Sequence, residues 1–239
     1  MNKNKFLWQK SVAVISLLVF YIGSQAQNQF GTWTSLTIDK KVDKWTFEAE
    51  TELRTISGLQ LINRWDMGLG AEYKIIKPLK IGLEYQFMNV LDEKYNNYQF
   101  RHRFTGSITG TKKFGNVQLA LLEGLQVTTK NDSKRIRDDE TIDRYKVNPA
   151  SMWKNSIEAE YNIPKCKITP EFEFKTYYSL NDPDGNAFNK LRYTLSLKYK
   201  LSKRNSINVF GVYNKELGTD EADYSGKYIL GLKYSYHLK

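Results

Sequence analysis

The chain of 239 residues contains one cysteine and two histidines. Because Cys166 is alone, no disulfide bond can form within the chain. His102 and His237 are too few for most histidine-dependent catalytic or metal sites. The sequence also lacks a phosphate-binding glycine loop, a zinc-ligand spacing and a dinucleotide fingerprint. These absences predict a protein without a metal or cofactor, and they argue against most enzyme classes.

Long apolar runs are also scarce. Three lysines within the first ten residues precede an apolar stretch over 11–20, and Ser24-Gln-Ala26 then supplies small residues. This order is that of a secretory signal peptide, so we expect residues 1–26 to be cleaved and residues 27–239 to form one domain. No later segment holds about 18 consecutive apolar residues, which argues against a spanning helix in the mature chain.

Basic residues exceed acidic ones but do not form a single patch. Cleavage of the signal peptide removes three lysines and no acid, which lowers the formal charge from +10 to +7. The remaining basic residues are interleaved with acids, so we do not expect nucleic-acid binding. The mean hydropathy of −0.57 is that of a soluble protein. A membrane barrel gives the same average when one face of every strand contacts water.

What the sequence has in abundance is alternation between apolar and polar residues. In segment 44–54 the odd positions are mainly apolar, whereas the even positions include three glutamates. Side chains of a strand alternate between its two faces, so this segment predicts one apolar and one charged face. The pattern returns along most of the chain. It predicts an all-β fold, a transmembrane antiparallel up-and-down β-barrel of about 10–12 strands.

The predicted connections alternate between tight and long. We expect tight turns near residues 40–43, 76–78, 112–116, 163–166 and 201–205, and longer connections near residues 55–61, 91–97, 130–149, 180–188 and 216–223. Outer-membrane barrels have short periplasmic turns and longer external loops. The polar segment 130–149 is therefore expected to be an external loop.

Two segments fit this scheme poorly. Residues 28–38 resemble an eleventh strand, whereas bacterial single-chain barrels have even strand counts. This segment could be a barrel strand, a luminal segment or part of a twelve-strand count.

The second segment contains Glu123, which is out of phase with Leu119 and Leu121. We expect a β-bulge near residues 121–122 that returns Glu123 to the water side.

The polar strand faces are expected to line a narrow, charged lumen. The expected wall residues are Glu48, Glu50, Glu52, Arg64, Glu84, Arg101, Arg103, Glu158, Glu160, Glu171, Glu173 and Arg192. These residues could form a salt-bridge network that fills the interior. They could instead line a conducting pore or a binding cavity.

Three short motifs resemble a known family. They are Phe30-Gly-Thr-Trp33 followed by a basic turn, the glutamate-rich strand that ends in Leu53-Arg54, and Arg101-His-Arg-Phe104. Together they resemble an uncharacterised, domain-of-unknown-function family of Gram-negative outer-membrane barrels. The final segment, 229–236, resembles the carboxyl-terminal signal that the barrel insertion machinery recognises. The resemblance implies localisation in the outer membrane and contact with its lipid. It implies no established activity and assigns no catalytic residue.

These features predict a porin-like outer-membrane protein that acts as a narrow channel or conduit for small solutes. The alternative is a non-conducting structural or binding barrel that uses the 130–149 loop. A third hypothesis is a lipid-modifying enzyme, because His102 lies on an apolar strand face between Phe100 and Phe104. No companion serine is evident on that face, so the expectation is that the protein is not an enzyme.

Overall fold

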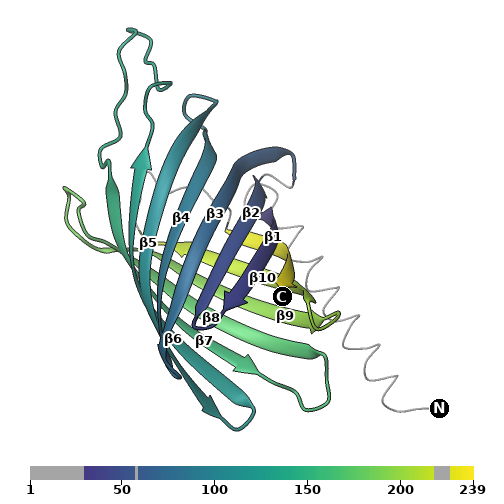
Figure 1. Cartoon of the computed structure of the whole chain (residues 1–239). Helices are drawn as coiled ribbons and strands as arrows, with labels where there is room; N and C mark the ends of the chain where they lie inside the picture. The colour runs from purple at the N-terminus through teal and green to yellow at the C-terminus, as the bar shows by residue number, and fades with distance from the viewer. Residues whose placement is uncertain (1–29, 57–58, 218–226) are drawn as a thin grey trace.

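The computed structural model describes residues 30–56, 59–217 and 227–239, so the expected signal peptide lies outside the described residues. The described strands form a closed barrel (Figure 1). They are β1 (Phe30–Val42), β2 (Trp45–Ile56), β3 (Leu61–Ile76), β4 (Leu79–Asp92), β5 (Asn97–Phe114), β6 (Val117–Lys130), β7 (Ala150–Tyr161), β8 (Ile168–Ser179), β9 (Phe188–Lys200), β10 (Asn205–Glu216) and β11 (Tyr228–Leu238). Among the described residues, no helix is long and apolar enough to cross a membrane.

The predicted alternation is confirmed by the exposure of the side chains. On β2, Phe47 is 48% exposed, whereas Glu52 is 8% exposed. Leu69, Leu83 and Leu195, on three other strands, are 63%, 74% and 64% exposed. The outward-facing apolar residues of the strands are called the apolar belt below. The polar faces of the same strands point into the barrel.

The barrel closes through a parallel pair of strands. β1 pairs with β11 in parallel, from Phe30 opposite Tyr228 to Lys40 opposite Leu238. β1 also pairs with β2 in the antiparallel direction, as do all the other neighbouring strands. Segment 28–38 therefore belongs largely to a barrel strand, and the described strands number eleven. This outcome confirms the first of the three alternatives for segment 28–38 and agrees with the expected 10–12 strands. An odd number of sequential antiparallel strands forces the first and last strands to run in the same direction, so the even count usual in bacterial barrels does not apply here.

The two rims of the barrel differ in their connections. One rim carries the tight turns at 43–44, 77–78 and 115–116, and is called the short-turn rim. The other carries residues 131–149 and is called the long-loop rim; this loop rises above the barrel in Figure 1. The connection expected near residues 91–97 lies on this rim but is shorter than expected, since it comprises only residues 93–96. Asp92 still pairs with Asn97, because the ladder between β4 and β5 continues through the polar residues there.

The barrel has a small apolar cluster at its inner face. Trp33, Val212 and Ile229 are buried, and Phe210 packs against them. Phe210 lies directly opposite Gly231 on β11. A Cβ atom at Gly231 would lie 2.0 Å from the Phe210 ring, so only glycine leaves room for this contact.

The bulge expected near residues 121–122 is absent. β6 shows no register shift against β5 or β7. Glu123 consequently lies on the outer face, between Leu121 and Leu125, which are 58% and 53% exposed. The Trp153 indole Nε1 donates a hydrogen bond of 2.7 Å to Glu123 Oε2. This donor satisfies one carboxylate oxygen on the outer face.

Candidate functional site

The lumen wall is the candidate functional site. Residues directly opposite each other on paired strands share a face of the sheet. Glu50 lies opposite Thr37 on one side and opposite Gly68 on the other. Thr37 is 2% exposed and donates a hydrogen bond of 2.8 Å to Glu50 Oε2. These contacts place the polar face of β2 inside the barrel.

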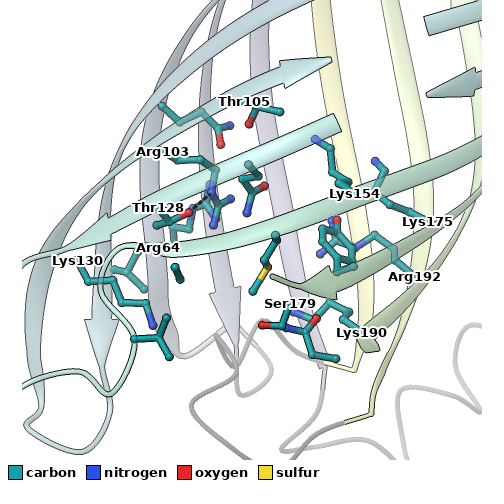
Figure 2. Close-up of a pocket in the computed structure, with 18 of the residues that line it drawn as sticks. Arg64, Arg103, Thr105, Thr128, Lys130, Lys154, Lys175, Ser179, Lys190 and Arg192 are labelled. Carbon is teal, nitrogen blue, oxygen red and sulfur yellow. Dashed lines mark hydrogen bonds between the residues drawn. The ribbon is translucent and has the colours of Figure 1, made fainter. Parts of the chain in front are cut away.

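A cavity of about 290 Å³ lies in the half of the lumen nearer the long-loop rim. Nine basic and three acidic residues contribute to its lining. Figure 2 shows Arg64 and Arg103 on one wall and Lys154, Lys175 and Arg192 on the facing wall. Seven lining residues of this half are called the basic band: Arg54, Arg64, Arg103, Lys154, Lys175, Lys190 and Arg192.

Two arginines of the basic band are held by a buried tryptophan. The guanidinium of Arg54 lies 3.9 Å from the centroid of the Trp33 ring, and that of Arg192 lies 4.7 Å from it. Such contacts are attractive because the ring face carries partial negative charge. Arg192 Nε also donates a hydrogen bond of 2.9 Å to Asn214 Oδ1. These contacts fix the orientation of both guanidinium groups in the wall.

Two other arginines lie in the wall from β3 and β5. Arg64 Nε is 2.5 Å from Asp66 Oδ2, and both side chains are buried. Arg103 Nε donates a hydrogen bond of 3.1 Å to Thr128 Oγ1. Glu52 belongs to the same half of the wall, where its carboxylate lies 2.6 Å from Arg54 Nε. The acids of this half are therefore close partners of its arginines.

The half of the lumen nearer the short-turn rim is mainly acidic. Glu158 lies opposite Glu173, and Glu160 lies opposite Glu171, on the paired strands β7 and β8. Like charges directly opposite each other are unfavourable unless bases or water screen them. Lys175 lies 2.7 Å from Glu173 and screens one of the four. The acidic band comprises Glu48, Glu50, Glu84, Glu158, Glu160, Glu171 and Glu173.

Three strands show the order of the two bands directly. β2 carries Arg54 and Glu50, β7 carries Lys154 and Glu158, and β8 carries Lys175 and Glu171. In each pair the base is nearer the long-loop rim and the acid lies four residues closer to the short-turn rim. At about 3.3 Å per residue the separation along the strand is roughly 13 Å. The two bands therefore lie one after the other along the lumen.

Lys233 is a base that lies among the glutamates of the acidic band. Lys233 Nζ is 2.6 Å from Glu50 Oε2, although the two residues are 183 positions apart in the sequence. The contact joins β11 to β2 across the intervening strand β1. It therefore stabilises the barrel at the parallel closure.

The 131–149 loop is anchored to the long-loop rim. Arg135 Nε lies 2.9 Å from Asp92 Oδ2, and both side chains are buried. The Arg135 guanidinium also lies 3.9 Å from the centroid of the Tyr145 ring. Tyr145 Oη in turn donates a hydrogen bond of 3.1 Å to Asp92. The base of the predicted external loop is thus a packed structure.

Asp143 is the polar centre of this anchor. Lys94, Tyr95 and Arg137 donate hydrogen bonds to its carboxylate at 2.8, 2.7 and 2.6 Å. The bonds from Lys94, Tyr95 and Arg137 hold the pKa of Asp143 well below its usual range. Hydrogen bonds to the charged form favour that form. Asp143 is therefore ionised at neutral pH and ties the loop to the turn between β4 and β5.

The expected wall residues separate into the two halves. Glu52, Arg64, Arg101, Arg103 and Arg192 lie toward the long-loop rim, and Glu48, Glu50, Glu84, Glu158, Glu160, Glu171 and Glu173 form the acidic band. Arg101 is 6% exposed and lies beside Tyr145, with 5.8 Å between its guanidinium and the ring centroid. Arg101 therefore meets the base of the loop. The role of this set in transport stays a prediction.

Several wall residues were missing from the expected set. Lys154, Lys175 and Lys190 line the cavity, and Trp33 orients two of its arginines. On their strands, the three lysines alternate in the same polar phase as Glu158, Glu173 and Arg192. The alternation in the sequence could therefore have identified them as wall residues. Trp33 shares its phase on β1 with Ser35 and Thr37, opposite to Leu36 and Ile38, so the alternation could have placed it in the wall as well. Its aromatic side chain concealed this, because a large aromatic residue is expected on the apolar face.

The two histidines lie in different settings. His102 is on the outer face, where its Nδ1 lies 2.8 Å from the Tyr85 hydroxyl. His237 Nδ1 lies 2.5 Å from Asp39 Oδ1 near the short-turn rim. Among the residues described, no group of three or more His, Cys, Asp or Glu side chains is arranged to hold a metal ion.

Comparison with known proteins gives a family and a fold. Residues 30–224 match the family described as "Protein of unknown function (DUF2490)". No curated protein matches the sequence. The NanC porin in a rhombohedral crystal form is similar with a TM-score of 0.50 and 10% identity, over 85% of this chain and 93% of that one.

Two further solved structures are similar at lower TM-scores. A bacterial polysaccharide outer membrane secretin has a TM-score of 0.49 and 11% identity, over 82% of this chain and 63% of that one. The KdgM porin in complex with disordered oligogalacturonate has a TM-score of 0.46 and 11% identity, over 77% of this chain and 90% of that one. At these identities the likeness concerns the fold, which is an outer-membrane-type β-barrel resembling porins.

Proposed function

We propose that this chain, which belongs to the family described as "Protein of unknown function (DUF2490)", spans the outer membrane as a narrow conduit for small solutes. The apolar belt supports the location, because a water-soluble protein rarely exposes so much contiguous apolar surface. In the membrane the belt contacts lipid. The long-loop rim then faces the exterior and the short-turn rim faces the periplasm.

The observation that carries the conduit proposal is the charged lumen wall. Charged side chains inside a barrel are stable when water or opposite charges accompany them. Half of the residues that line the cavity of about 290 Å³ are charged, and the cavity leaves space for water or a small solute. A barrel that served only as a scaffold could fill this space with apolar side chains at lower cost.

Conductance across a planar lipid bilayer tests the proposal. The purified barrel should give discrete current steps in KCl, of small size because the lumen is narrow. A heat-modifiable shift on a denaturing gel establishes that the inserted protein is folded. A folded barrel that inserts into the bilayer and gives no steps contradicts the conduit proposal.

A second candidate function is binding of an external partner by the 131–149 loop. It is favoured by the anchored base of the loop and by two exposed isoleucines beyond that base. Ile136 and Ile142 pair across a short bridge and are 56% and 47% exposed. An apolar pair presented on a fixed stem suits contact with another macromolecule.

Site-specific cross-linking in intact cells tests this second function. A photo-reactive residue at position 136 should give one discrete cross-linked product. The same residue at position 184, in the neighbouring connection, is the control and should not give that product. Loss of the product on deletion of residues 136–142, with the heat-modifiable fold intact, supports binding; absence of any product in the undeleted protein contradicts it.

The proposal includes no enzymatic activity. His102 is engaged with Tyr85 on the outer face, and a lipid hydrolase needs a nucleophile, a base and an orienting group in reach of one another. His102→Ala should therefore leave the release of fatty acid from membrane lipid at background level. Hydrolysis by the purified protein that disappears in His102→Ala contradicts this expectation.

A further inference from the structure

We infer that the cavity within the basic band is a binding site for a small organic anion that carries two or more carboxylate or phosphate groups. This inference rests on the proposed conduit and names the class of solute that it would accept. Nine basic residues and three acidic residues line the cavity. A site with this excess of fixed positive charge attracts anions, and walls of low dielectric constant strengthen the attraction.

Several of the basic groups retain capacity for a ligand. Among the residues that the structure describes, Lys154 and Arg192 have no carboxylate within ion-pairing distance. Arg64 is 5% exposed, and its Nη2 atom has no hydrogen-bond partner within the described ranges. Buried donors of this kind are normally satisfied. An anionic oxygen in the cavity would supply the missing partner.

The groups also come from facing walls. Arg64 and Arg103 project from β3 and β5, whereas Lys154 and Arg192 project from β7 and β9 (Figure 2). A ligand with a single anionic group would reach one wall at a time. A ligand with two or more groups can contact both walls at once, and this bridging favours a multivalent anion.

The chemistry of the donors suits carboxylate and phosphate alike. Arginine presents a planar fork that matches either group, and lysine adds a compact positive charge. The Trp33 ring and Asn214 hold the Arg192 guanidinium in place before a ligand arrives. Less conformational freedom is therefore lost on binding.

The size of the cavity limits the ligand. Its volume of about 290 Å³ lies at the lower end of the range for ligand pockets, which is about 300–1,000 Å³. A molecule with the dimensions of citrate fits this range, whereas a long polymer could place only a short segment in the cavity. The inference therefore concerns small polyanions.

Isothermal titration calorimetry of the full barrel in a neutral detergent tests the inference without any need for conduction. The probes are citrate, pyrophosphate, acetate and putrescine. Citrate and pyrophosphate represent the carboxylate and phosphate sources, acetate tests the need for more than one charge, and putrescine is a cation control. We expect citrate or pyrophosphate to bind at least about tenfold more tightly than acetate, and putrescine not to compete.

A double substitution locates the site. Lys154→Gln with Arg192→Gln should weaken polyanion binding by about tenfold or more, because two charge-assisted contacts are removed. Lys198→Gln is the matched control, since Lys198 lies toward the short-turn rim on β9, the same strand as Arg192. The control should bind as the unsubstituted barrel does. Heat-modifiable migration on a gel checks that each variant is folded.

The outcomes separate this inference from the proposed function. Equal binding of acetate and citrate, or equal binding in the double variant and the unsubstituted barrel, overturns the polyanion site. If the double variant fails to fold, the comparison of the four probes on the unsubstituted barrel still decides. If the barrel gives current steps in a bilayer but does not bind polyanions, the conduit proposal stands and the polyanion site is contradicted. If the barrel binds polyanions but gives no current steps, the polyanion site stands and the conduit proposal is contradicted.

Discussion

The charged side chains at the two ends of the lumen carry mainly opposite charge. Toward the long-loop rim, Arg54, Lys154 and Lys175 project from β2, β7 and β8, and four residues further along the same strands lie Glu50, Glu158 and Glu171. In the proposed conduit, a solute would therefore meet a positive region and then a negative one. The positive region attracts anions and repels cations, and the negative region does the reverse.

The two halves also differ in how their charges are held. In the basic half, Trp33 fixes two guanidinium groups and Asp66 pairs with Arg64. In the acidic half, Glu158 faces Glu173 directly across the strand pair. The basic half is therefore preorganised for a ligand, whereas the acidic half contains like charges that gain from a mobile counter-ion. In the proposed conduit, the basic half would bind the solute and the acidic half would filter it.

The largest effect is expected from removing the aromatic support of the basic half. Trp33→Ala deletes a side chain that is 6% exposed and should lower the free energy of unfolding by about 3–5 kcal/mol. Trp33→Phe keeps an aromatic face toward Arg54 and Arg192 and should lose much less. Urea unfolding in lipid vesicles measures both variants. Equal losses in the two variants would show that the ring face is not what supports the arginines.

Charge reversal in the acidic half should change ion selectivity. Glu158→Lys with Glu171→Lys replaces two negative charges by two positive charges, so that bases extend along more of the lumen. The ratio of anion to cation permeability should rise by about tenfold, which corresponds to about 1.4 kcal/mol. The reversal potential in a KCl gradient measures this ratio. Glu123→Gln, on the outer face, is the control and should leave the ratio unchanged.

The pH dependence of the loop anchor follows from Asp143. Its folded-state pKa is depressed below the ordinary value of 3.8, so the stabilisation is fully present above that value. It is lost as the pH falls through the folded-state pKa. Protease resistance of the 131–149 loop should therefore stay constant from pH 8 to about pH 4 and decline only in stronger acid.

Asp143→Asn supplies the control for this interpretation. The amide removes the charge that Lys94 and Arg137 contact, so the loop should become more sensitive to protease at neutral pH. Its sensitivity should no longer depend on acid in the same range. A variant loop as resistant as the original at pH 7 would contradict the role assigned to Asp143.

The smallest effect is expected at the outer face. Glu123 lies within the apolar belt, where a charge in contact with lipid is unfavourable. Glu123→Gln removes the charge and keeps an oxygen that can accept the Trp153 hydrogen bond. The variant should be more stable by about 1 kcal/mol, since acids cost less than bases at this position in barrels. Unfolding in vesicles checks the sign, and a loss of stability would place Glu123 outside the hydrocarbon.

Much of the fold could be predicted from alternation alone. Because the alternation has a period of two residues, it determines which face of a strand each residue occupies. The apolar belt and the charged wall therefore follow directly from segments such as 44–54. The period does not state how neighbouring strands are aligned. The parallel pairing of β1 with β11 and the contact between Glu50 and Lys233 depend on that alignment, and no local pattern contains it.

The order of the two bands could not be predicted for the same physical reason. The position of a residue along the lumen depends on the strand alignment added around the whole barrel. The expected wall residues were therefore a single mixed set of acids and bases. Glu123 shows a second limit of prediction from alternation. The pattern predicts only apolar residues on the outer face, whereas the Glu123 carboxylate lies there and accepts a hydrogen bond from Trp153.

The most direct test of the account is the current through single barrels as a function of voltage. Two opposite charge bands in series should give larger current at one polarity than at the other in 0.1 M KCl. The asymmetry should decrease in 1 M KCl, because the screening length falls from about 10 Å to about 3 Å. Currents of equal size at both polarities in 0.1 M KCl would contradict the arrangement of a basic half followed by an acidic half.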